Sequence, residues 1–228
     1  MAKRIGIIGG ISHESTIKYY EYILKKYYAR KKNYHYPEMV IFSLDLKKLM
    51  DFEDMKDIDG YVHYLREGIK ALEKAGAEFI VIAANSPHSV FEIVEKMASV
   101  PMISIVEVAA REAKKWGMKK LLLTGIKYTM QSSFYQDVFN KHGMEVITPS
   151  EIEQDEINKI VFNELVLGIF KQETKVKLIK MVNNYKVDGV ILGCTELPLI
   201  FDQEDTDVKL LNTLVLHARA ALDFALAD

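Results

Sequence analysis

The sequence lacks the features of a disulfide-stabilised, membrane-spanning or nucleic-acid-binding protein. It has one cysteine, Cys194, in 228 residues, which excludes an intrachain disulfide and a CxxC zinc or redox motif. No apolar run approaches the roughly 18 residues of a membrane span, and the N-terminal apolar stretch is too short for a signal peptide. The net charge of -2 offers no general attraction for nucleic acid. We therefore expect a cytoplasmic protein that binds a small molecule and neither nucleic acid nor membrane.

The residues that are present predict alternating strands and helices. Hydrophobic residues make up 49% of the chain and charged residues 27%, as in an ordinary globular protein. Short apolar runs, typical of buried parallel strands, occupy 4–8, 39–44, 79–84, 102–106, 120–124, 145–148, 189–193 and 208–211. Amphipathic stretches predict helices at 14–32, 59–75, 90–98, 108–116, 131–142, 151–170, 173–185 and 213–227. This alternation favours parallel sheets covered by helices on both faces.

An internal repeat divides the chain into two similar halves. The segment AEFIVIAANSPH (77–88) aligns with VDGVILGCTELP (187–198), and KRIGIIGG (3–10) aligns with MKKLLLTG (118–125). We predict an α/β fold of two pseudo-symmetric lobes, each a parallel sheet flanked by helices. The first lobe is expected to contain residues 1–107 and a C-terminal helix at 212–228, and the second residues 108–211.

Four short polar loops follow predicted strands: 9–12, 84–86, 124–129 and 194–196. Ligands of open parallel sheets bind outside the carboxyl ends of the strands. The glycines, hydroxyls and amides of these loops, including Gly10 and Ser12, suit a carboxylate or phosphate receptor near helix N-termini. If the lobes face each other, the loops enclose one cleft with an active site. The Gly9-Gly10 pair is not part of a GxGxxG motif and also fits a simple tight turn.

Several side chains near these loops have both a functional and a structural interpretation. Cys194 follows a strand, and a helix start behind it would lower the pKa of its thiol; the alternative is a buried structural cysteine. His88 either donates a hydrogen bond to an anionic substrate or makes a structural one. Lys47 and Lys127 are candidate counterions for a substrate carboxylate, although a solvated surface also explains lysines. The six histidines show no metal-binding spacing.

A set of motifs in order along the whole chain resembles the aspartate/glutamate racemase family. They are IGIIGGISHESTIKYY near the start, AANSPH at 83–88, TGIKYTMQSSFY at 124–135, FNELVLGIF at 162–170 and GCTELPL at 193–199. The sequence looks closest to the aspartate racemase branch. Glutamate racemases usually open with Asp-Ser-Gly and carry His after Gly-Cys-Thr, where this chain has Gly-Gly-Ile and Glu196.

The resemblance implies racemisation of aspartate, with glutamate as a second candidate, without pyridoxal phosphate or metal and in a homodimer. It implies two bases, because inversion needs acid–base groups on both faces of the α-carbon. In such enzymes two cysteines at repeat-related strand ends serve this role, and Cys194 matches the second. Asn85, Ser86 and Thr195 match positions that hold the α-carboxylate. Thr129 matches a hydroxyl that contacts substrate, and Glu196 belongs to the same substrate loop.

The sequence departs from the family pattern at Ala84, which stands where the first thiol is expected. Three explanations remain open: replacement of a native cysteine, a natural single-thiol racemase that uses another group such as His88 or water, or one-sided protonation as in arylmalonate decarboxylase-like relatives. Loss of one acid–base group reduces a rate by about 10²–10⁴-fold, so we expect reduced or abolished racemisation. A decarboxylase or isomerase of dicarboxylates and a non-catalytic amino-acid binding protein are the alternative functions.

Overall fold

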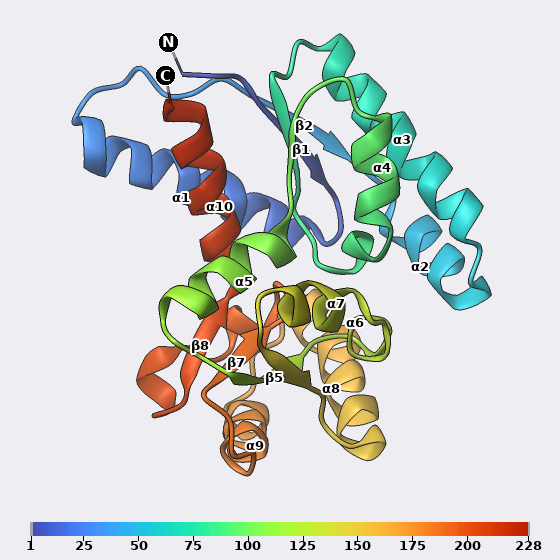
Figure 1. Cartoon of the computed structure of the whole chain (residues 1–228), viewed down its shortest axis with the longest axis vertical. Helices are drawn as coiled ribbons and strands as arrows, with labels where there is room; N and C mark the ends of the chain where they lie inside the picture. The colour runs from blue at the N-terminus through green and yellow to red at the C-terminus, as the bar shows by residue number, and fades with distance from the viewer. Residues whose placement is uncertain (1, 228) are drawn as a thin grey trace. The chain divides into compact units, whose positions relative to one another are not determined.

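The computed structural model describes residues 2–227, which form two compact units (Figure 1). Unit 1 runs to Ile105 and resumes at Leu214, and unit 2 is Val106–Thr213. The chain therefore leaves unit 1 in helix α5 (Ile105–Lys115) and re-enters it in helix α10 (Thr213–Leu226). None of the helices within residues 2–227 combines the length and the apolar character that crossing a membrane requires.

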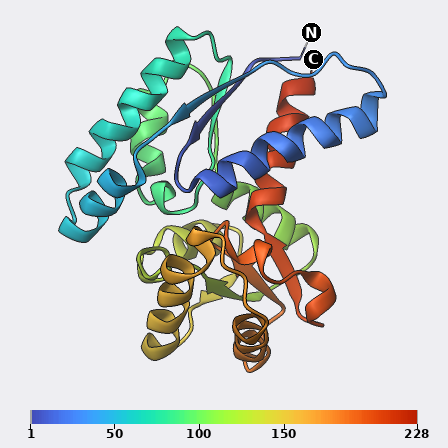
Figure 2. The same ribbon diagram turned by 180° about the vertical axis from the view of Figure 1, so that it is seen from behind.

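Unit 1 is built on a four-stranded parallel sheet of order β2-β1-β3-β4. The strands are β1 (Ile5–Gly9), β2 (Met39–Ser43), β3 (Phe79–Ile82) and β4 (Met102–Ile103). Their connections hold α1 (His13–Lys31), α2 (Leu46–Met55), α3 (Ile58–Lys74), the 3-10 turn η1 (Ser86–Val90) and α4 (Phe91–Met97). Figure 2 shows α1 and α10 on one side of this sheet and α3 with α4 on the other.

Alternate residues of the unit 1 strands fill two cores. Ile8, Ile80 and Ile82 pack with apolar side chains of α3 such as Leu65 and Ile69. The other face carries residues such as Ile7 and Val81, which pack with α1 and α10 through a cluster that also contains Tyr19, Ile23, Ala218 and Leu222. Burial on both faces explains why the strands read as continuous apolar runs in the sequence.

Unit 2 repeats this design with a parallel sheet of order β6-β5-β7-β8. Its strands are β5 (Lys120–Thr124), β6 (Glu145–Ile147), β7 (Gly189–Leu192) and β8 (Lys209–Asn212). Its other elements are α6 (Lys127–Gln131), α7 (Phe134–Lys141), α8 (Glu151–Asn163), η2 (Leu165–Leu167), α9 (Gln172–Asn183), η3 (Leu197–Leu199) and η4 (Gln203–Asp205). The predicted fold class, two α/β lobes with parallel sheets, is confirmed.

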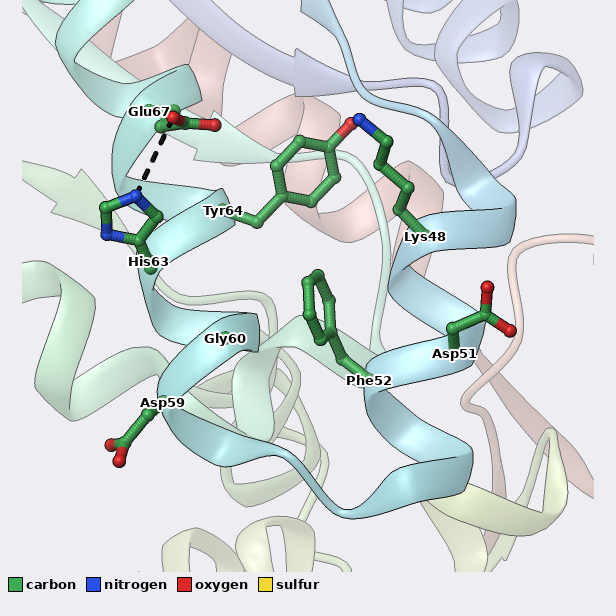
Figure 3. Close-up of a pocket in the computed structure, with 8 residues that line it drawn as sticks. All are labelled: Lys48, Asp51, Phe52, Asp59, Gly60, His63, Tyr64 and Glu67. Atoms are coloured by element: carbon green, nitrogen blue, oxygen red, sulfur yellow. Dashed lines mark ion pairs between the residues drawn. The ribbon is translucent and has the colours of Figure 1, made fainter.

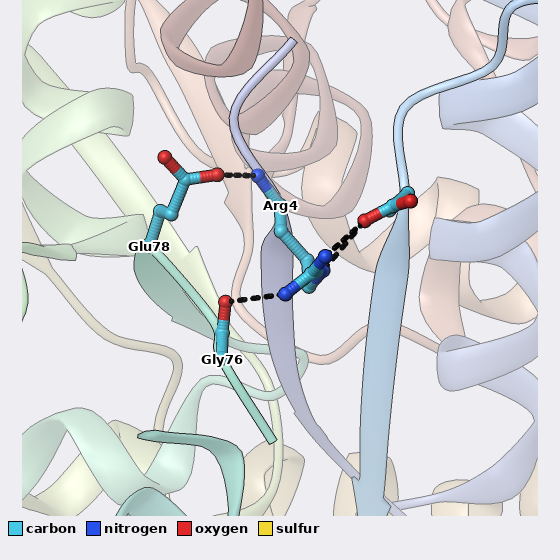
Figure 4. Close-up of polar contacts among 4 residues, drawn as sticks. Arg4, Gly76 and Glu78 are labelled. Atoms are coloured by element: carbon cyan, nitrogen blue, oxygen red, sulfur yellow. Dashed lines mark hydrogen bonds and ion pairs between the residues drawn. The ribbon is translucent and has the colours of Figure 1, made fainter. Parts of the chain in front are cut away.

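An acidic residue before the central strand ties the amino ends of each sheet together. In unit 1 the Arg4 backbone N–H donates to Glu78 Oε2 at 2.6 Å, and its guanidinium donates to Glu38 Oε2 at 2.7 Å and to the Gly76 carbonyl at 3.1 Å (Figure 4). In unit 2, Asp188 Oδ2 accepts from the backbone N–H groups of Lys119 and Lys120 at 2.7 and 2.9 Å. These two sets of hydrogen bonds, called clamps below, lie at the amino ends of the sheets. The polar loops lie at the opposite, carboxyl ends of the strands.

Helix α2 is absent from the sequence prediction and is a correction to it. Asp45 begins the helix, because its carboxylate accepts from the backbone N–H of Lys47 at 2.9 Å and of Lys48 at 3.4 Å. The helix buries Leu49 and leaves most of its other side chains in contact with water. Its short apolar stripe among charged residues gave too weak a periodic signal.

Other predicted elements are shorter than expected. The helix expected over 131–142 is α7 alone, which begins at Phe134, because Ser132 has an extended backbone; the short helix α6 before it ends at Gln131 and was not predicted. The helix expected over 151–170 ends at Asn163, and a turn with Gly168 in the left-handed region follows it. The strand expected over 102–106 stops at Ile103, since α5 already begins at Ile105.

Candidate functional site

In unit 2, Cys194 lies directly beyond the carboxyl end of β7. The residue is 6% exposed and packs in the apolar core cluster of the unit. Its Sγ donates to Glu196 Oε2 at 2.8 Å, and the Thr195 hydroxyl donates to the same oxygen at 3.2 Å. Glu196 is itself buried. The loop thus holds a thiol and a carboxylate in direct contact, which is an arrangement for passing a proton between sulfur and oxygen.

The surroundings raise the pKa of the Cys194 thiol well above its usual value. Burial is the main cause, and the negative charge of Glu196 and its hydrogen bond add to the effect. The backbone N–H groups of Glu196 and Leu197 favour the thiolate and lower the pKa, but they do not outweigh burial. The expectation of a lowered pKa from a helix start was therefore wrong for this loop, because the η3 turn is short and the sulfur is enclosed.

Two glycines and Thr129 surround the base of the Cys194 loop. A side chain at Gly193 would place its Cβ 2.8 Å from the Thr124 carbonyl, and one at Gly125 would meet the Gly193 carbonyl at 2.8 Å. The loops after β5 and β7 therefore meet through backbone atoms, with no room for a side chain at either glycine. Thr129, on α6, packs against both glycines. Within residues 2–227 its buried Oγ1 has no hydrogen-bond partner, so it can bind a ligand atom.

In unit 1, Ala84, Asn85 and Ser86 are buried at the carboxyl end of β3. The loop after β1 lies beside them, since the Ser15 hydroxyl donates to both the Ala83 carbonyl at 3.2 Å and the Ser12 carbonyl at 3.1 Å. The structure thus brings the predicted residues Ser12, Ala84, Asn85 and Ser86 to one edge of one sheet. Ala84 contributes no group that can exchange a proton.

Gly10 has a structural reason for being glycine. Its φ is +85°, and a side chain there would place Cβ 2.3 Å from the carbonyl oxygen of Leu44. Its N–H donates to the Thr16 hydroxyl at 2.9 Å, which fixes the turn into α1. The tight-turn interpretation explains this residue without a ligand.

His88 makes two hydrogen bonds to backbone groups. Its Nε2 accepts from the Ile105 N–H at 3.1 Å, so the ring proton is on Nδ1 and donates to the Ala84 carbonyl at 3.0 Å. Burial, with a smaller effect of the nearby His217, lowers the pKa of His88 to about 3. These contacts favour the structural interpretation of His88 as a neutral support for the loop.

Lys47 is exposed, Lys127 is half-buried, and both are already paired. The Lys47 side chain is 74% exposed and forms an ion pair with Asp51 on the same helix. Lys127 forms an ion pair with Asp155 at 2.5 Å and is 41% exposed.

Glu53 is a candidate that sequence analysis missed. This partly buried residue of α2 accepts a hydrogen bond from Tyr61 Oη at 2.8 Å and is hydrogen-bonded by the Ser86 side chain. Burial raises the pKa of its carboxyl group. With α2 recognised, the i,i+4 spacing from the buried Leu49 would have placed Glu53 on the inward side of the helix.

An open hollow of about 780 Å³ lies between α2 and α3 (Figure 3). Phe52 and Tyr64 stand in it with ring centroids 6.1 Å apart, and Lys48 Nζ lies 5.4 Å from the centre of the Tyr64 ring. Its rim carries carboxylates and His63, which pairs with Glu67 at 3.7 Å. The residues that line it include none of the predicted site residues. Within residues 2–227, the hollow included, no three His, Cys, Asp or Glu side chains gather as metal ligands would.

The sequence and fold resemble those of known racemases. The family model for Asp/Glu/Hydantoin racemases matches residues 8–221. The broad specificity amino-acid racemase RacX of Bacillus subtilis is 28% identical over 240 residues, which cover 98% of each chain.

Solved structures extend the resemblance. An aspartate racemase homologue from Pyrococcus horikoshii OT3 is 39% identical, with a TM-score of 0.85 over 99% of each chain. The aspartate racemase of Picrophilus torridus is 22% identical, with a TM-score of 0.78 over 98% of this chain and 94% of that one, which shows likeness of fold.

Proposed function

Because the chain belongs to the Asp/Glu/Hydantoin racemase family, we propose that it interconverts the enantiomers of aspartate, with glutamate as a second candidate substrate. The observation that carries this proposal is the contact between Cys194 Sγ and Glu196 Oε2 at 2.8 Å in a buried loop beyond β7. Thiol and carboxylate in contact supply acid–base chemistry at an α-carbon without a cofactor.

In the proposed mechanism Cys194 performs one of the two proton transfers. Glu196 accepts the thiol proton, and the resulting thiolate removes the α-proton from one enantiomer. For the other enantiomer the steps reverse, and the thiol returns its proton to the carbanion. The raised pKa of the thiol suits the acid direction, since the group is protonated before substrate binds. The backbone N–H groups of Glu196 and Leu197 support the thiolate once it forms.

Small polar groups near the strand ends receive the substrate in this proposal. Each unit offers groups for a carboxylate and for charge that develops next to it: Asn85 and the backbone at Ser86 in unit 1, and Thr195 in unit 2. Thr129 offers its buried hydroxyl. Gly10, Ser12 and His88 shape these loops, and Lys47 and Lys127, which pair with Asp51 and Asp155, are the candidate counterions for a substrate carboxylate.

We further propose that the protein acts in the cytoplasm as a homodimer. The single free cysteine suits a reducing compartment. Exposed tyrosines at the end of α1, with Tyr28 and Tyr34 stacked at 5.7 Å between ring centroids, suit a contact with a second copy.

The test is loss of the α-proton signal of L- and D-aspartate in D₂O, followed by proton NMR. Cys194→Ser should slow exchange of one enantiomer by about 10²–10⁴-fold, because oxygen at this position is a far weaker acid than sulfur. Ser133→Ala, which changes an exposed hydroxyl of unit 2, is the matched control. Equal exchange in the native protein and the Cys194 variant would refute the assignment of the thiol.

Ala84 favours a second candidate function, one-sided protonation by a single thiol. A decarboxylase of substituted malonates or a cis–trans isomerase of dicarboxylates needs one thiol and a carboxylate receptor. Incubation with aryl-malonates and with maleate, followed by product analysis, separates these reactions from racemisation. Tight aspartate binding without any α-proton exchange, even in Ala84→Cys, would instead indicate a binding protein.

A further inference from the structure

Racemisation requires a second proton-exchanging group besides Cys194, and the loop after β3 does not contain an obvious one. Ala84 has no such group, and both ring nitrogens of His88 are bound to backbone. A second proton transfer is needed only if the protein is a racemase, so this inference rests on the proposed function. The carboxyl group of Glu53 reaches this loop from α2, where the Ser86 side chain is hydrogen-bonded to it.

Glu53 is held between two hydroxyl groups that come from different elements. Tyr61 Oη, from α3, donates to Glu53 Oε1 at 2.8 Å, and the Ser86 hydroxyl bonds to the same carboxyl group from η1. Ser86 is 7% exposed and stands two residues after Ala84. The carboxyl group is thus fixed behind a serine hydroxyl at the carboxyl end of β3, within reach of proton exchange with it.

We propose that Glu53 is a positioning residue that stores the second proton of the reaction and exchanges it with substrate through the Ser86 hydroxyl. In one direction the carbanion takes the proton of Ser86 Oγ while protonated Glu53 gives its proton to that oxygen. In the other direction Ser86 Oγ takes the α-proton while its own proton moves to the Glu53 carboxylate. Each transfer leaves Ser86 neutral and changes only Glu53 and the α-carbon.

The surroundings of Glu53 suit both directions. Burial raises the pKa of the carboxyl group, the negative charge of Asp54 on the same helix adds to the rise, and the hydrogen bonds from Ser86 and Tyr61 oppose it. The protonated form is therefore populated closer to neutral pH than for an exposed glutamate. Tyr61 stabilises the carboxylate that remains after the proton has left.

Enantiomer-resolved exchange in D₂O tests the proposal. Glu53→Gln and Ser86→Ala should each slow the α-proton exchange of one enantiomer by about 10²–10⁴-fold. The affected enantiomer should be the one whose exchange survives Cys194→Ser, while the other should exchange at the native rate. That surviving rate also reports that the variant is folded. Asp59→Asn, an exposed change of equal charge on α3, is the matched control.

The pH profile separates proton storage from a merely structural role. Exchange that depends on Glu53 should follow the titration of a carboxyl group with a raised pKa, and Glu53→Asp should retain that profile at a lower rate. If Glu53→Gln exchanges the α-proton as fast as Asp59→Asn does, while Cys194→Ser still slows exchange, this inference is overturned and the proposed function stands. If Glu53→Gln fails to fold, Ser86→Ala decides by the same criterion. Absence of exchange in the native protein would overturn the proposed function itself.

Discussion

The loops after β3 and β7 hold the same place in two sheets of the same strand order, yet their chemistry differs. The loop after β7 carries a thiol and a carboxylate in contact, Cys194 and Glu196. The loop after β3 carries Ala84 and Asn85, and a carboxyl group reaches it from a neighbouring helix, that of Glu53. The comparison teaches that a repeated backbone design can be kept while the proton-exchanging groups come from different places.

The largest expected effect comes from restoring a thiol in the loop after β3. Ala84→Cys should raise α-proton exchange and racemisation of aspartate by up to about 10²–10⁴-fold, because a thiol that acts directly on the α-carbon takes over the second proton transfer from the relay through Ser86 and Glu53. Proton NMR in D₂O measures exchange, and polarimetry measures racemisation. Ala84→Ser is the matched control for size.

The same substitution should make Glu53 dispensable. In the Ala84→Cys background, Glu53→Gln should leave the rate nearly unchanged, since the new thiol exchanges the second proton directly. An Ala84→Cys variant no faster than Ala84→Ser would show that the two loops are not functional counterparts.

The next effect concerns acid stability, which should differ between the units. Burial lowers the pKa of His88 to about 3 and of His217 to about 4, against 6.5 for an ordinary histidine. Above pH 6.5 the histidines are neutral in both the folded and the unfolded chain, so they leave stability unaffected. Below pH 6.5 the unfolded chain binds more protons than the folded protein. As the pH falls toward 4, each histidine reduces stability by about 1.4 kcal/mol per pH unit. Both histidines belong to unit 1.

Hydrogen exchange at pH 7 and pH 5, corrected for intrinsic rates, measures this difference. Peptides from α10 and β3 should gain exchange at pH 5 before peptides from β7. His217→Gln should reduce the effect, because an amide can still accept from Tyr19 and donate to the Ile103 carbonyl without titrating. Earlier opening of unit 2 would contradict the prediction.

A third prediction concerns the Cys194 thiol. Glu196→Gln should lower the thiol pKa, because it removes the negative charge that, after burial, most raises it. Thiolate absorbance and alkylation rate against pH report this group alone, since the chain has no other cysteine. Glu173→Gln, an exposed change of equal charge, should have no effect. An unchanged titration in Glu196→Gln would show that burial alone sets the pKa.

The smallest expected effects concern the clamps at the amino ends of the sheets. Glu78→Gln and Asp188→Asn should each destabilise the protein by only about 0.5–1 kcal/mol, because exposed charged hydrogen bonds contribute little net free energy. Urea denaturation of both variants measures this. Similar losses would support the equivalence of the two clamps, and a loss confined to one would break it.

The sequence predicted those parts of the molecule that depend on local patterns. The runs FIVI and GVIL are buried on both faces, so their strands could be recognised without knowing their neighbours. The internal repeat aligned Ala84 with Cys194. The two sheets have the same strand order, so these residues follow equivalent strands, β3 and β7.

The remaining features depend on contacts between distant residues. Glu53 became visible only when α2 was placed beside Ser86, 33 positions along the chain. The raised pKa of Cys194 depends on enclosure of the sulfur, which a strand-end position does not reveal. The roles of the His88 nitrogens depend on the Ile105 N–H, 17 residues away.

The first and last described segments of the chain lie next to each other in unit 1. Joining them and opening the chain elsewhere would therefore change the order of the units along the sequence. The Lys3 N–H donates to the Ala225 carbonyl at 2.8 Å, and its ammonium group donates to the Ala227 carbonyl at 2.8 Å, so the ends lie together as Figure 1 shows. Unit 2 is one continuous stretch, whereas unit 1 is assembled from two. A circular permutant joined at these ends and opened at Ile105 would encode each unit as an uninterrupted segment. Such a gene would read as a tandem pair, the arrangement that duplication of a single ancestral half first produces.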